Sequence, residues 1–547
     1  PTEQRDGKWL QGEVHDPRSH LLGGVAGHAG LFSTAEDLAI YAQMMIGGGE
    51  HGGVQVLSPR TVAVMTRGYK VSTGLRGLGW DKRTGYSINR GELLTESAFG
   101  HGGFTGTVLW IDPELELFVI FLSNRLHPDG KGLVNPLAGK IGTVAAAAIR
   151  DQPVAGTLRM PSGAGGTRSV PATYCGIDVL SRDNFRQLAG RKVGLITNHT
   201  GRSREGASTV KLLHDAKNFE LVALFSPEHG FEGKLDIARI GDTQDQGTGL
   251  KVLSLYGETR KPTKEMLDGL DTLVFDIQDI GARFYTYVST MGEAMKAAAE
   301  HGKRFVVLDR PNPIGGTQVA GPMLDRGRES FIAFHRLPVR HGMTIGELAL
   351  MFKAELKLDL DLQVIECEGW RRSDAFDATG LVWVNPSPNM RSLTQAFLYP
   401  GIGLLETTNL SVGRGTDTPF EVIGAPWLDG RKLALELSSR RIPGVTFVPI
   451  EFTPSSSKFS GEKCGGINIV ITDRTRFEPL CTGLEIALML RKLYPEQWDA
   501  KAYDRLLGNQ ATQEAILADK SIDEVQTAAR EGVSDFLRRR TKYLIYE

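Results

Sequence analysis

The stretches LVALF at residues 221–225, TLVF at 272–275 and RFVVL at 304–308 decide the fold. Apolar, β-branched runs of this length are typical of strands that are buried on both faces of a sheet. The segments between them have the pattern of helices, which predicts βαβ crossovers and a doubly wound parallel sheet. Because parallel strands end at one edge, the residues that follow them should meet in the crevice where such sheets bind ligands.

Polar side chains follow each of the three runs directly. Glu228 stands between Phe225 and Phe231, and partial shielding there would raise its pKa, as a general acid working near neutral pH requires. The competing interpretation is a turn in which Glu228 caps a helix and His229 fills a polar core site. The residues predicted to converge on one pocket are Glu228, His229, Asp276, Asp279, Arg283, Asp309 and Asn312.

The segment from Asp276 to Tyr287 combines carboxylates, a guanidinium and aromatic rings. In an extended stretch, Arg283, Tyr285 and Tyr287 would point to the same side. Sugar sites use ring faces for stacking and charged side chains for hydroxyls and acidic groups. The alternative is an Asp–Arg ion pair that only holds a loop. Later polar loops could close over the pocket, although such loops are common on surfaces; they would contribute Asn385, Glu406, Asn409 and Arg414.

Hydrolysis of a glycosidic bond usually needs two carboxyl groups, one to protonate the leaving oxygen and one to attack or to activate water. We predict Glu228 as the acid, and its partner stays open among Asp276, Asp279, Asp309 and Glu406. No phosphate-binding glycine pattern follows a strand. The spacing of Asp276, Asp279 and His229 matches no standard metal site. We therefore expect neither a cofactor nor a metal.

Length and composition indicate a chain of several domains. Its 547 residues exceed one ordinary core. The 63 basic and 64 acidic residues leave a formal charge of −1, which favours a small molecule or a glycan as the partner over nucleic acid. No apolar run reaches the roughly 18 residues of a membrane helix. The four cysteines lie far apart without CxxC spacing, so neither zinc binding nor a dense disulfide framework is indicated.

A stretch rich in Pro, Gly and small polar residues, 151–174, is interpreted as a linker. It separates a first domain at 1–150 from a long α/β region. Within that region we predict a Rossmann-like catalytic subdomain at 175–320, whose first strand spans Lys192 to Thr197. Beyond it the pattern changes, with a helix that begins in a capping box at Thr344, a strand from Leu362 to Glu366 and loop-rich stretches after them. The helical tail from Gly483 onward should dock onto the body through Phe536 and Tyr543. We therefore predict a second α/β subdomain at 321–547 that closes the cleft.

Six motifs of the α/β region resemble those of the exo-acting β-N-acetylmuramidase family, whose members are NamZ-like and were long known as a domain of unknown function. The resemblance covers nearly all of 175–547. Its motifs are SPEHGFEG (226–233), DIQDIGARFYTY (276–287), DRPNPIGG (309–316), RHGMTIGE (340–347), NPSPNM (385–390) and TNLSVGRGT (408–416).

The resemblance implies removal of terminal N-acetylmuramic acid from the non-reducing ends of peptidoglycan fragments, in a cleft between two α/β subdomains. It implies Glu228 as the leading acid/base, with the cleft lined by His229, Asp279, Arg283 and Tyr285. One arginine among Arg283, Arg340 and Arg414 would pair with the lactyl carboxylate of muramic acid. The implied compartment is the cell envelope, periplasmic or extracellular.

The first segment resembles the C-terminal part of serine β-lactamase and penicillin-binding-protein-like hydrolases, with an α+β fold. The matching stretches are GHAGLFSTAED (27–37) and FGHGGFTGT (99–107), and His101 opens the triplet that stands for the family's Lys-Thr-Gly box. That family's nucleophile lies upstream in an S-x-x-K motif. The matches Ser208–Lys211 and Ser455–Lys458 come after the box, so we take them as coincidences.

We therefore expect 1–150 to be a partial domain from a longer polypeptide, with apolar core surface uncovered and no acyl-transfer activity. Two alternatives to the glycosidase hypothesis stay open. The α/β region could be a glycan- or muropeptide-binding module that turns nothing over. The full-length parent could instead be a serine β-lactamase-like hydrolase.

Overall fold

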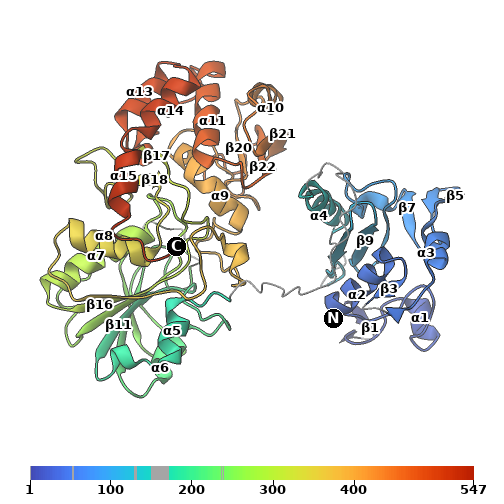
Figure 1. Ribbon diagram of the computed structural model, residues 1–547, viewed down its shortest axis with the longest axis horizontal. Coiled ribbons are helices and arrows are strands. Elements are labelled where there is room, and N and C mark those ends of the chain that lie inside the picture. The colour runs from blue at the N-terminus through green and yellow to red at the C-terminus, as the bar shows by residue number, and fades with distance from the viewer. Residues whose placement is uncertain are drawn as a thin grey trace, which may run out of the picture. The chain divides into compact units, whose positions relative to one another are not determined.

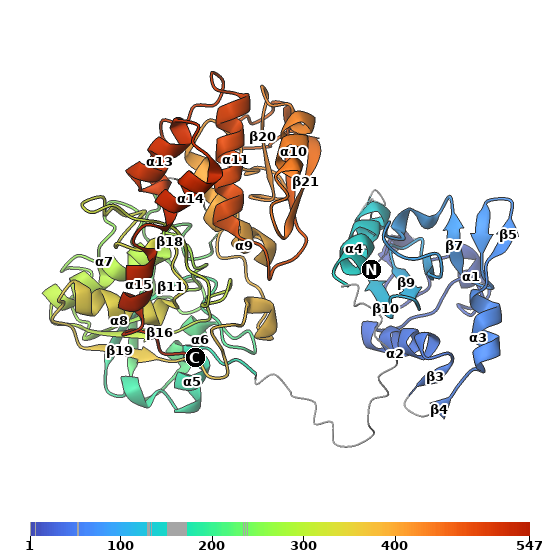
Figure 2. The ribbon, with the colours of Figure 1, turned by 45° about the horizontal axis from the view of Figure 1, so that its top comes forward.

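The computed structural model contains two compact units, Pro1–Ser162 and Gly163–Glu547, which are described separately (Figures 1 and 2). Most of the stretch interpreted as a linker lies outside the described residues. No helix among the described residues is long and apolar enough to cross a membrane. The residues that the structure describes are 2–5, 7–51, 54–127, 132, 134–149, 172–233, 235, 237 and 239–547.

The first unit is built on a six-stranded antiparallel sheet with the order β10-β9-β8-β7-β6-β5. Two short antiparallel pairs accompany it, β1 (Gln4–Arg5) with β2 (Lys8–Trp9) and β3 (Glu50–His51) with β4 (Val54–Gln55). The sheet strands are β5 (Tyr69–Val71), β6 (Gly74–Arg76), β7 (Asp81–Thr84), β8 (Phe99–Gly102), β9 (Val108–Asp112) and β10 (Leu117–Phe121). The helices are α1 (Pro17–Leu21), α2 (Ala35–Ile46), α3 (Pro59–Thr66) and α4 (Asn135–Ala147).

Alternation along β9 gives this sheet two apolar faces. Ile111 packs with residues of α2, such as Met45. Its neighbour Trp110 packs with Ala138 and Ala146 of α4. Figures 1 and 2 both show β9 between these two helices. The expected α+β character of the first segment is thus present.

Both cores of the first unit are small, and much apolar surface remains open. Of the large apolar side chains exposed among the described residues, 22 lie in the first 149 positions and seven in the second unit. Leu21, Val25 and Leu31 are 85%, 85% and 89% exposed. Because single domains rarely leave so much apolar surface in water, the expected uncovered core surface is confirmed.

The second unit contains a seven-stranded sheet with the order β13-β14-β12-β11-β15-β16-β19. All neighbours pair in parallel except the edge strand β13 (Thr243–Gln244), which is antiparallel. Counted along the chain, the parallel strands have the order 3-2-1-4-5-6 of a doubly wound sheet. They are β11 (Lys192–Thr197), β12 (Glu220–Ser226), β14 (Lys251–Ser254), β15 (Thr272–Asp276), β16 (Arg304–Leu308) and β19 (Leu362–Ile365).

Helices cover both faces of this sheet, as the apolar runs predict. In β16, Phe305 and Val307 join the core under α7 (Tyr287–Glu300) and α8 (Ile345–Glu355). Val306 joins the opposite core under α5 and α6. Figure 1 shows the sheet between these helix pairs. The other pair is α5 (Gly176–Arg182) and α6 (Thr209–Asp215).

The parallel sheet does not end at the predicted subdomain boundary near residue 320. The strand predicted near Leu362 exists as β19, but it pairs in parallel with β16 and so belongs to the first sheet. The capping box of Thr344 and Glu347 also starts α8 as predicted, and α8 packs on that same sheet. The chain therefore returns to the Rossmann-like layer well after residue 320.

The rest of the second unit is a small antiparallel sheet with helices around it. The sheet order is β20-β22-β21, and α9 packs against α11 where Gly401 and Gly483 meet. The strands are β20 (Val422–Ala425), β21 (Val445–Phe452) and β22 (Cys464–Ile471), and β17 (Ala320–Met323) pairs with β18 (Pro338–Arg340). The helices are α9 (Leu393–Ile402), α10 (Gly430–Ser439), α11 (Pro479–Leu493), α12 (Asp504–Leu507), α13 (Gln510–Leu517), α14 (Ile522–Arg530) and α15 (Val533–Arg540).

The last residues of the chain return to the parallel sheet. The Tyr546 hydroxyl donates to Asp309 Oδ2 at 2.6 Å, and it accepts from the Cys367 backbone N–H at 2.8 Å. The backbone N–H of Ile545 donates to Glu347 at 2.9 Å. Phe536, in α15, is 1% exposed, so the expected docking of the helical tail is confirmed for that residue.

Candidate active site

The loops after β11, β12 and β15 border a cavity of about 830 Å³ at the carboxyl edge of the parallel sheet. This edge lies beside the point where the strand order reverses, which is where doubly wound sheets bind ligands. His199 comes from the first loop, Glu232 from the second and Gln278 from the third. Trp383 and Ser387 close the cavity from a later segment.

Glu228 follows β12 and is half-buried. The Thr286 hydroxyl, just before α7, donates to its Oε2, which fixes one oxygen. His229 turns the chain with a φ of +69°, and its Nδ1–H donates to the Leu235 carbonyl at 2.7 Å. Glu228 itself does not line the 830 Å³ cavity. Its neighbourhood is a wall of tyrosines next to that cavity.

Asp279 lies in the loop after β15 and is 6% exposed. The Gly281 N–H donates to its Oδ2 at 2.8 Å, whereas its buried Oδ1 has no hydrogen-bond partner among the described residues. Burial raises the pKa of Asp279 to about 7. Gly281 has a φ of +82°, and a Cβ there would lie 2.5 Å from the Asn312 side chain. Glycine is therefore required to shape this loop.

His341 lies behind Asp279. Its Nε2 is 3.9 Å from Asp279 Oδ2, and its Nδ1 accepts from the Met343 N–H at 3.2 Å. Acceptance at Nδ1 places the ring proton on Nε2, facing the carboxyl group. Burial lowers the pKa of His341 to about 3, with Arg540 and Arg340 acting in the same direction. His341 is therefore a neutral donor next to Asp279.

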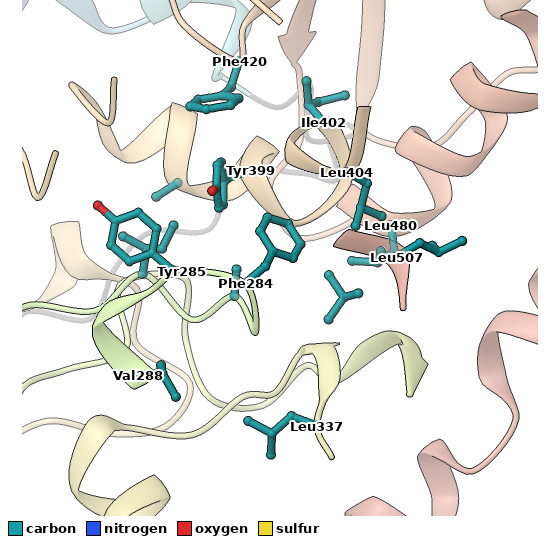
Figure 3. Packing of buried hydrophobic residues seen from close by; sticks show 14 of the residues in the cluster. Phe284, Tyr285, Val288, Leu337, Tyr399, Ile402, Leu404, Phe420, Leu480 and Leu507 are labelled. Atoms are coloured by element: carbon teal, nitrogen blue, oxygen red, sulfur yellow. The ribbon is translucent and has the colours of Figure 1, made fainter. Parts of the chain in front are cut away.

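Tyr285, Tyr287 and Tyr399 form an aromatic wall. Figure 3 shows two of them, Tyr285 and Tyr399, among the buried apolar residues around them. The ring of Tyr285 meets those of Tyr287 and Tyr399 edge-on, with centroids 5.0 and 5.9 Å apart. The Tyr287 hydroxyl donates to the Pro386 carbonyl at 2.6 Å, and Ser387 of the cavity lies beside the Tyr285 hydroxyl. The wall thus joins the cavity to the carboxylates.

Charged groups from the strand-end loops and from the later loops act on the same residue, Tyr399. Burial raises its pKa, and the carboxylates of Glu406, Glu228 and Asp279 act in the same direction, while Arg414 acts against them. Arg414 and Glu406 form an ion pair and are 27% and 22% exposed. The structure therefore brings together five predicted residues, Glu228, Asp279, Tyr285, Glu406 and Arg414, around a residue that was not predicted.

Two predicted carboxylates lie elsewhere, which corrects their proposed role. Asp276 is fully buried and paired with Arg310 at 2.5 Å, and its second oxygen also accepts from the Thr209 hydroxyl. Asp309 is fully buried and accepts bonds at both oxygens from Thr344, Gly346, Tyr546 and the backbone of Arg310. Neither carboxylate has an oxygen left for substrate.

Two predicted arginines are also structural. The Arg283 guanidinium is buried and donates to the carbonyls of Pro322, Leu337, Leu506 and Leu507. These four carbonyls engage the guanidinium, and the backbone N–H of Arg283 donates to the Val339 carbonyl of β18. Arg340, also buried, donates to Gln318 and to the Ile314 carbonyl. The expectation that either one binds substrate is not supported.

The predicted asparagines hold loops. Asn312 donates to the Met343 carbonyl at 2.9 Å. Asn409 donates to the Gln497 carbonyl at 2.7 Å and accepts from the Asp499 N–H. Asn385 is exposed and borders the cavity, where its carbonyl accepts from His199 Nε2 at 2.7 Å. Of these three, Asn385 alone lines the described cavity.

Sequence reasoning missed several residues of the site: Thr286, His341, Trp383, Tyr399 and Lys458. Thr286 and His341 stand inside quoted motifs, so their position in those motifs could have marked them. Tyr399 lies in an apolar helix and looks like a core residue. Among the described residues, no group of three or more His, Cys, Asp or Glu side chains could hold a metal ion.

A doubly wound sheet, two carboxyl groups at its carboxyl edge and an aromatic wall define a hydrolase-type site for a sugar. The family model for the N-terminal part of exo-β-N-acetylmuramidase NamZ matches residues 193–394, and the model for its C-terminal part matches 397–546. The chain therefore belongs to the exo-β-N-acetylmuramidase NamZ family. A β-lactamase family model matches 1–142, in agreement with the second resemblance.

Relatives and solved structures agree with this assignment. The peptidoglycan β-N-acetylmuramidase NamZ of Bacillus subtilis is 44% identical over 70% of this chain and 93% of its own length. Two crystal structures of DUF1343-family proteins from Bacteroides fragilis are 40% and 31% identical, with TM-scores of 0.65 and 0.57, and each covers 69% of this chain and 99% of its own.

The first segment has its own relatives. A Salmonella enteritidis protein named "Putative D-alanyl-D-alanine carboxypeptidase" is 39% identical over 131 residues, which are 23% of this chain and 30% of the relative. The chain thus spans about a third of that relative's length.

Proposed function

We propose that this chain is an exo-acting glycoside hydrolase that releases terminal N-acetylmuramic acid from peptidoglycan fragments, with Glu228 as the proton donor. One observation carries the assignment of the site. Glu228 and Asp279 come from loops after different strands, yet the Thr286 hydroxyl, in the segment that continues from Asp279, bonds Glu228. Thr286 stands between Tyr285 and Tyr287, whose rings are in contact, and both carboxyl groups act on the pKa of Tyr287 in the same direction. Family membership supports the substrate, and we place the activity in the cell envelope or outside the cell, where peptidoglycan lies.

Glu228 suits the role of general acid. It is half-buried and therefore reachable by substrate, and one of its oxygens is held by Thr286. The other oxygen can carry a proton to the glycosidic oxygen as the bond to the anomeric carbon breaks. A fixed carboxyl group needs little reorganisation when the transition state forms.

Asp279 is our candidate for the second carboxyl group. Asp276 and Asp309 are saturated by protein donors, and Glu406 is paired with Arg414. Asp279 keeps a buried oxygen, Oδ1, without a hydrogen bond in the described structure. Its pKa of about 7 allows it to hold or take a proton near neutral pH.

The substrate sugar has two further candidate contacts. Arg414 is the only one of the three predicted arginines in the described site that lies near the tyrosine wall, so we assign it to the lactyl carboxylate. Trp383 and the polar groups around His199 give the adjoining cavity the aromatic and polar lining that sugar sites use. We assign this cavity to the part of the fragment beyond the scissile bond.

A chromogenic N-acetylmuramide tests the proposal. Release of the chromophore by the wild type should fall about 10²- to 10⁴-fold in Glu228→Gln, because general acid catalysis contributes about that much. The matched control is Glu220→Gln, at the exposed opposite end of the same strand, which should keep full activity. Undiminished release by Glu228→Gln would remove its proposed role. Binding without any release by the wild type would favour a glycan-binding module.

A further inference from the structure

The turn at 455–459 is docked rigidly on the loop that carries Arg414. The backbone N–H and the hydroxyl of Ser455 both donate to the Gly415 carbonyl at 2.8 Å. A Cβ on Gly415 would lie 2.3 Å from the Ser456 carbonyl oxygen, so the two backbones are in direct contact. The turn and the arginine loop therefore form one body.

Strained backbone on both sides fixes Lys458 in this turn. Ser457 has a φ of +67° and Phe459 a φ of +59°, a region that side chains other than glycine rarely adopt. Two such residues lie within three positions, and backbone strain of this kind clusters at functional sites. The turn thus holds Lys458 in one direction at an energetic cost.

Lys458 points its ammonium group into the Glu406–Arg414 cluster. Its Nζ donates to the Glu406 backbone carbonyl, which is a neutral acceptor. The ammonium makes no ion pair with any described carboxylate, and the side chain is half-buried. Burial lowers the pKa of Lys458, and the guanidinium of Arg414 adds to this effect, against Glu406. Two of its three N–H donors remain for another acceptor.

This arrangement does not fit the S-x-x-K chemistry that Ser455 and Lys458 resemble. The Ser455 hydroxyl is bonded to Gly415 and the Lys458 amine to Glu406. The residues lie in a turn, not on the helix that would place serine and lysine on one face. The interpretation of the match as a coincidence is confirmed, and Lys458 needs a different explanation.

The Glu406 carboxylate acts on Lys458, but it is already ion-paired with Arg414. Two partly buried cations thus share one carboxylate, and a second anion would stabilise both. The two neighbours of Lys458, which are Glu406 and Arg414, act electrostatically on Tyr399. Glu228 and Asp279 act on the same tyrosine. Muramic acid differs from glucosamine by a lactyl ether that carries a carboxylate. Tyr399 itself is only 8% exposed, so the sugar does not stack on its ring. A muramic acid unit with its anomeric carbon at Glu228 would direct its lactyl carboxylate toward the partly exposed Glu406–Arg414 pair, where Lys458 lies.

We propose that Lys458 is a specificity-determining residue that binds the lactyl carboxylate of the muramic acid unit together with Arg414. The inference rests on the proposed function and adds a residue that selects the substrate. The ammonium supplies a charge-assisted hydrogen bond beside the guanidinium, so the pair discriminates a muramic acid terminus from a glucosamine terminus.

The test compares three chromogenic substrates on the full chain: the N-acetylmuramide, its lactyl methyl ester and the N-acetylglucosaminide. For the muramide, Lys458→Gln should raise KM about 10- to 100-fold with kcat nearly unchanged, because a hydrogen bond to a charged group is lost. Lys458→Arg should recover most of the affinity. On the ester, wild type and Lys458→Gln should be alike. The matched control is Lys463→Gln, an exposed lysine of the same region.

Two results of this kinetic comparison would overturn the inference. One is an unchanged KM for the muramide in Lys458→Gln. The other is an equal loss on acid and ester, which would indicate a merely structural role. If the wild type turns over no substrate, the proposed function fails, but calorimetry still decides the role of Lys458.

In calorimetry, the wild type should bind N-acetylmuramic acid more tightly than N-acetylglucosamine, and Lys458→Gln should lose that preference. A wild type that binds both sugars equally would refute the proposed role of Lys458.

Discussion

Replacing Asp276 by asparagine separates the structural role of this residue from the catalytic role that its place at a strand end suggests. Asp276 is fully buried, and Arg310, which is 6% exposed, donates to it from Nε at 2.5 Å and from Nη2 at 3.0 Å. The asparagine side chain would keep the shape but remove the charge. The guanidinium would then stay buried without a counter-ion.

The expected cost is large. Breaking one partner of a buried ion pair destabilises a protein by about 3–5 kcal/mol, because the remaining charge is uncompensated. Replacing both partners by uncharged groups costs less, since no buried charge is left. Asp276→Asn with Arg310→Met should therefore be more stable than Asp276→Asn alone. Activity per folded molecule of Asp276→Asn should stay close to that of the wild type, because Asp276 is fully buried and does not line the cavity. Arg310 borders that cavity, so the double variant is compared for stability alone.

Urea unfolding followed by circular dichroism measures the effect on the second unit, together with release from the chromogenic muramide at low temperature. Asp268→Asn, an exposed aspartate just before the same strand, is the control and should unfold like the wild type. The reasoning is refuted if Asp276→Asn keeps the wild-type midpoint and loses activity more than about 10²-fold, the size of a catalytic effect.

Two further predictions concern the interior of the second unit. Burial raises the pKa of Asp279 from 3.8 to about 7, so the folded state favours the neutral form of this carboxyl group. The unfolding free energy of the wild type, relative to that of Asp279→Asn, should therefore fall by up to about 4 kcal/mol as the pH rises from 4 to 7. Urea titration at each pH measures this difference. A flat difference would contradict this. Gly401→Ala should destabilise the second unit by about 1–3 kcal/mol, because the new Cβ would lie 1.9 Å from the Pro479 carbonyl oxygen. Gly241→Ala is the control, since a Cβ there would lie in open space. Equal urea midpoints for the two variants would refute the packing argument.

The parallel sheet could be predicted because its signal is local. Each buried strand is an uninterrupted apolar run, and β11 begins and ends at the predicted residues, Lys192 and Thr197. The membership of β19 could not be predicted, because pairing between strands more than fifty residues apart leaves no trace in periodicity. The same limit explains the misplaced boundary near residue 320.

The site was predicted where function depends on position at a strand end, and missed where it depends on distant partners. Glu228 and Asp279 follow their strands and reach the tyrosine wall. Arg283 looked equally suitable, but its acceptors at Leu506 and Leu507 lie 223 and 224 positions away. Lys458 was dismissed because its only local signal matched a motif of another family.

Asp309 is sealed by Tyr546, a residue 237 positions further along the chain. Ribosomes make proteins from the N-terminus, so Asp309 Oδ2 lacks this donor while everything between the two residues is being synthesised. The bonds from Arg310, Thr344 and Gly346 do not depend on Tyr546, which allows the sheet to form in the order of synthesis, as domains commonly do. The Tyr546 hydroxyl then completes the bonding of this buried carboxyl group last.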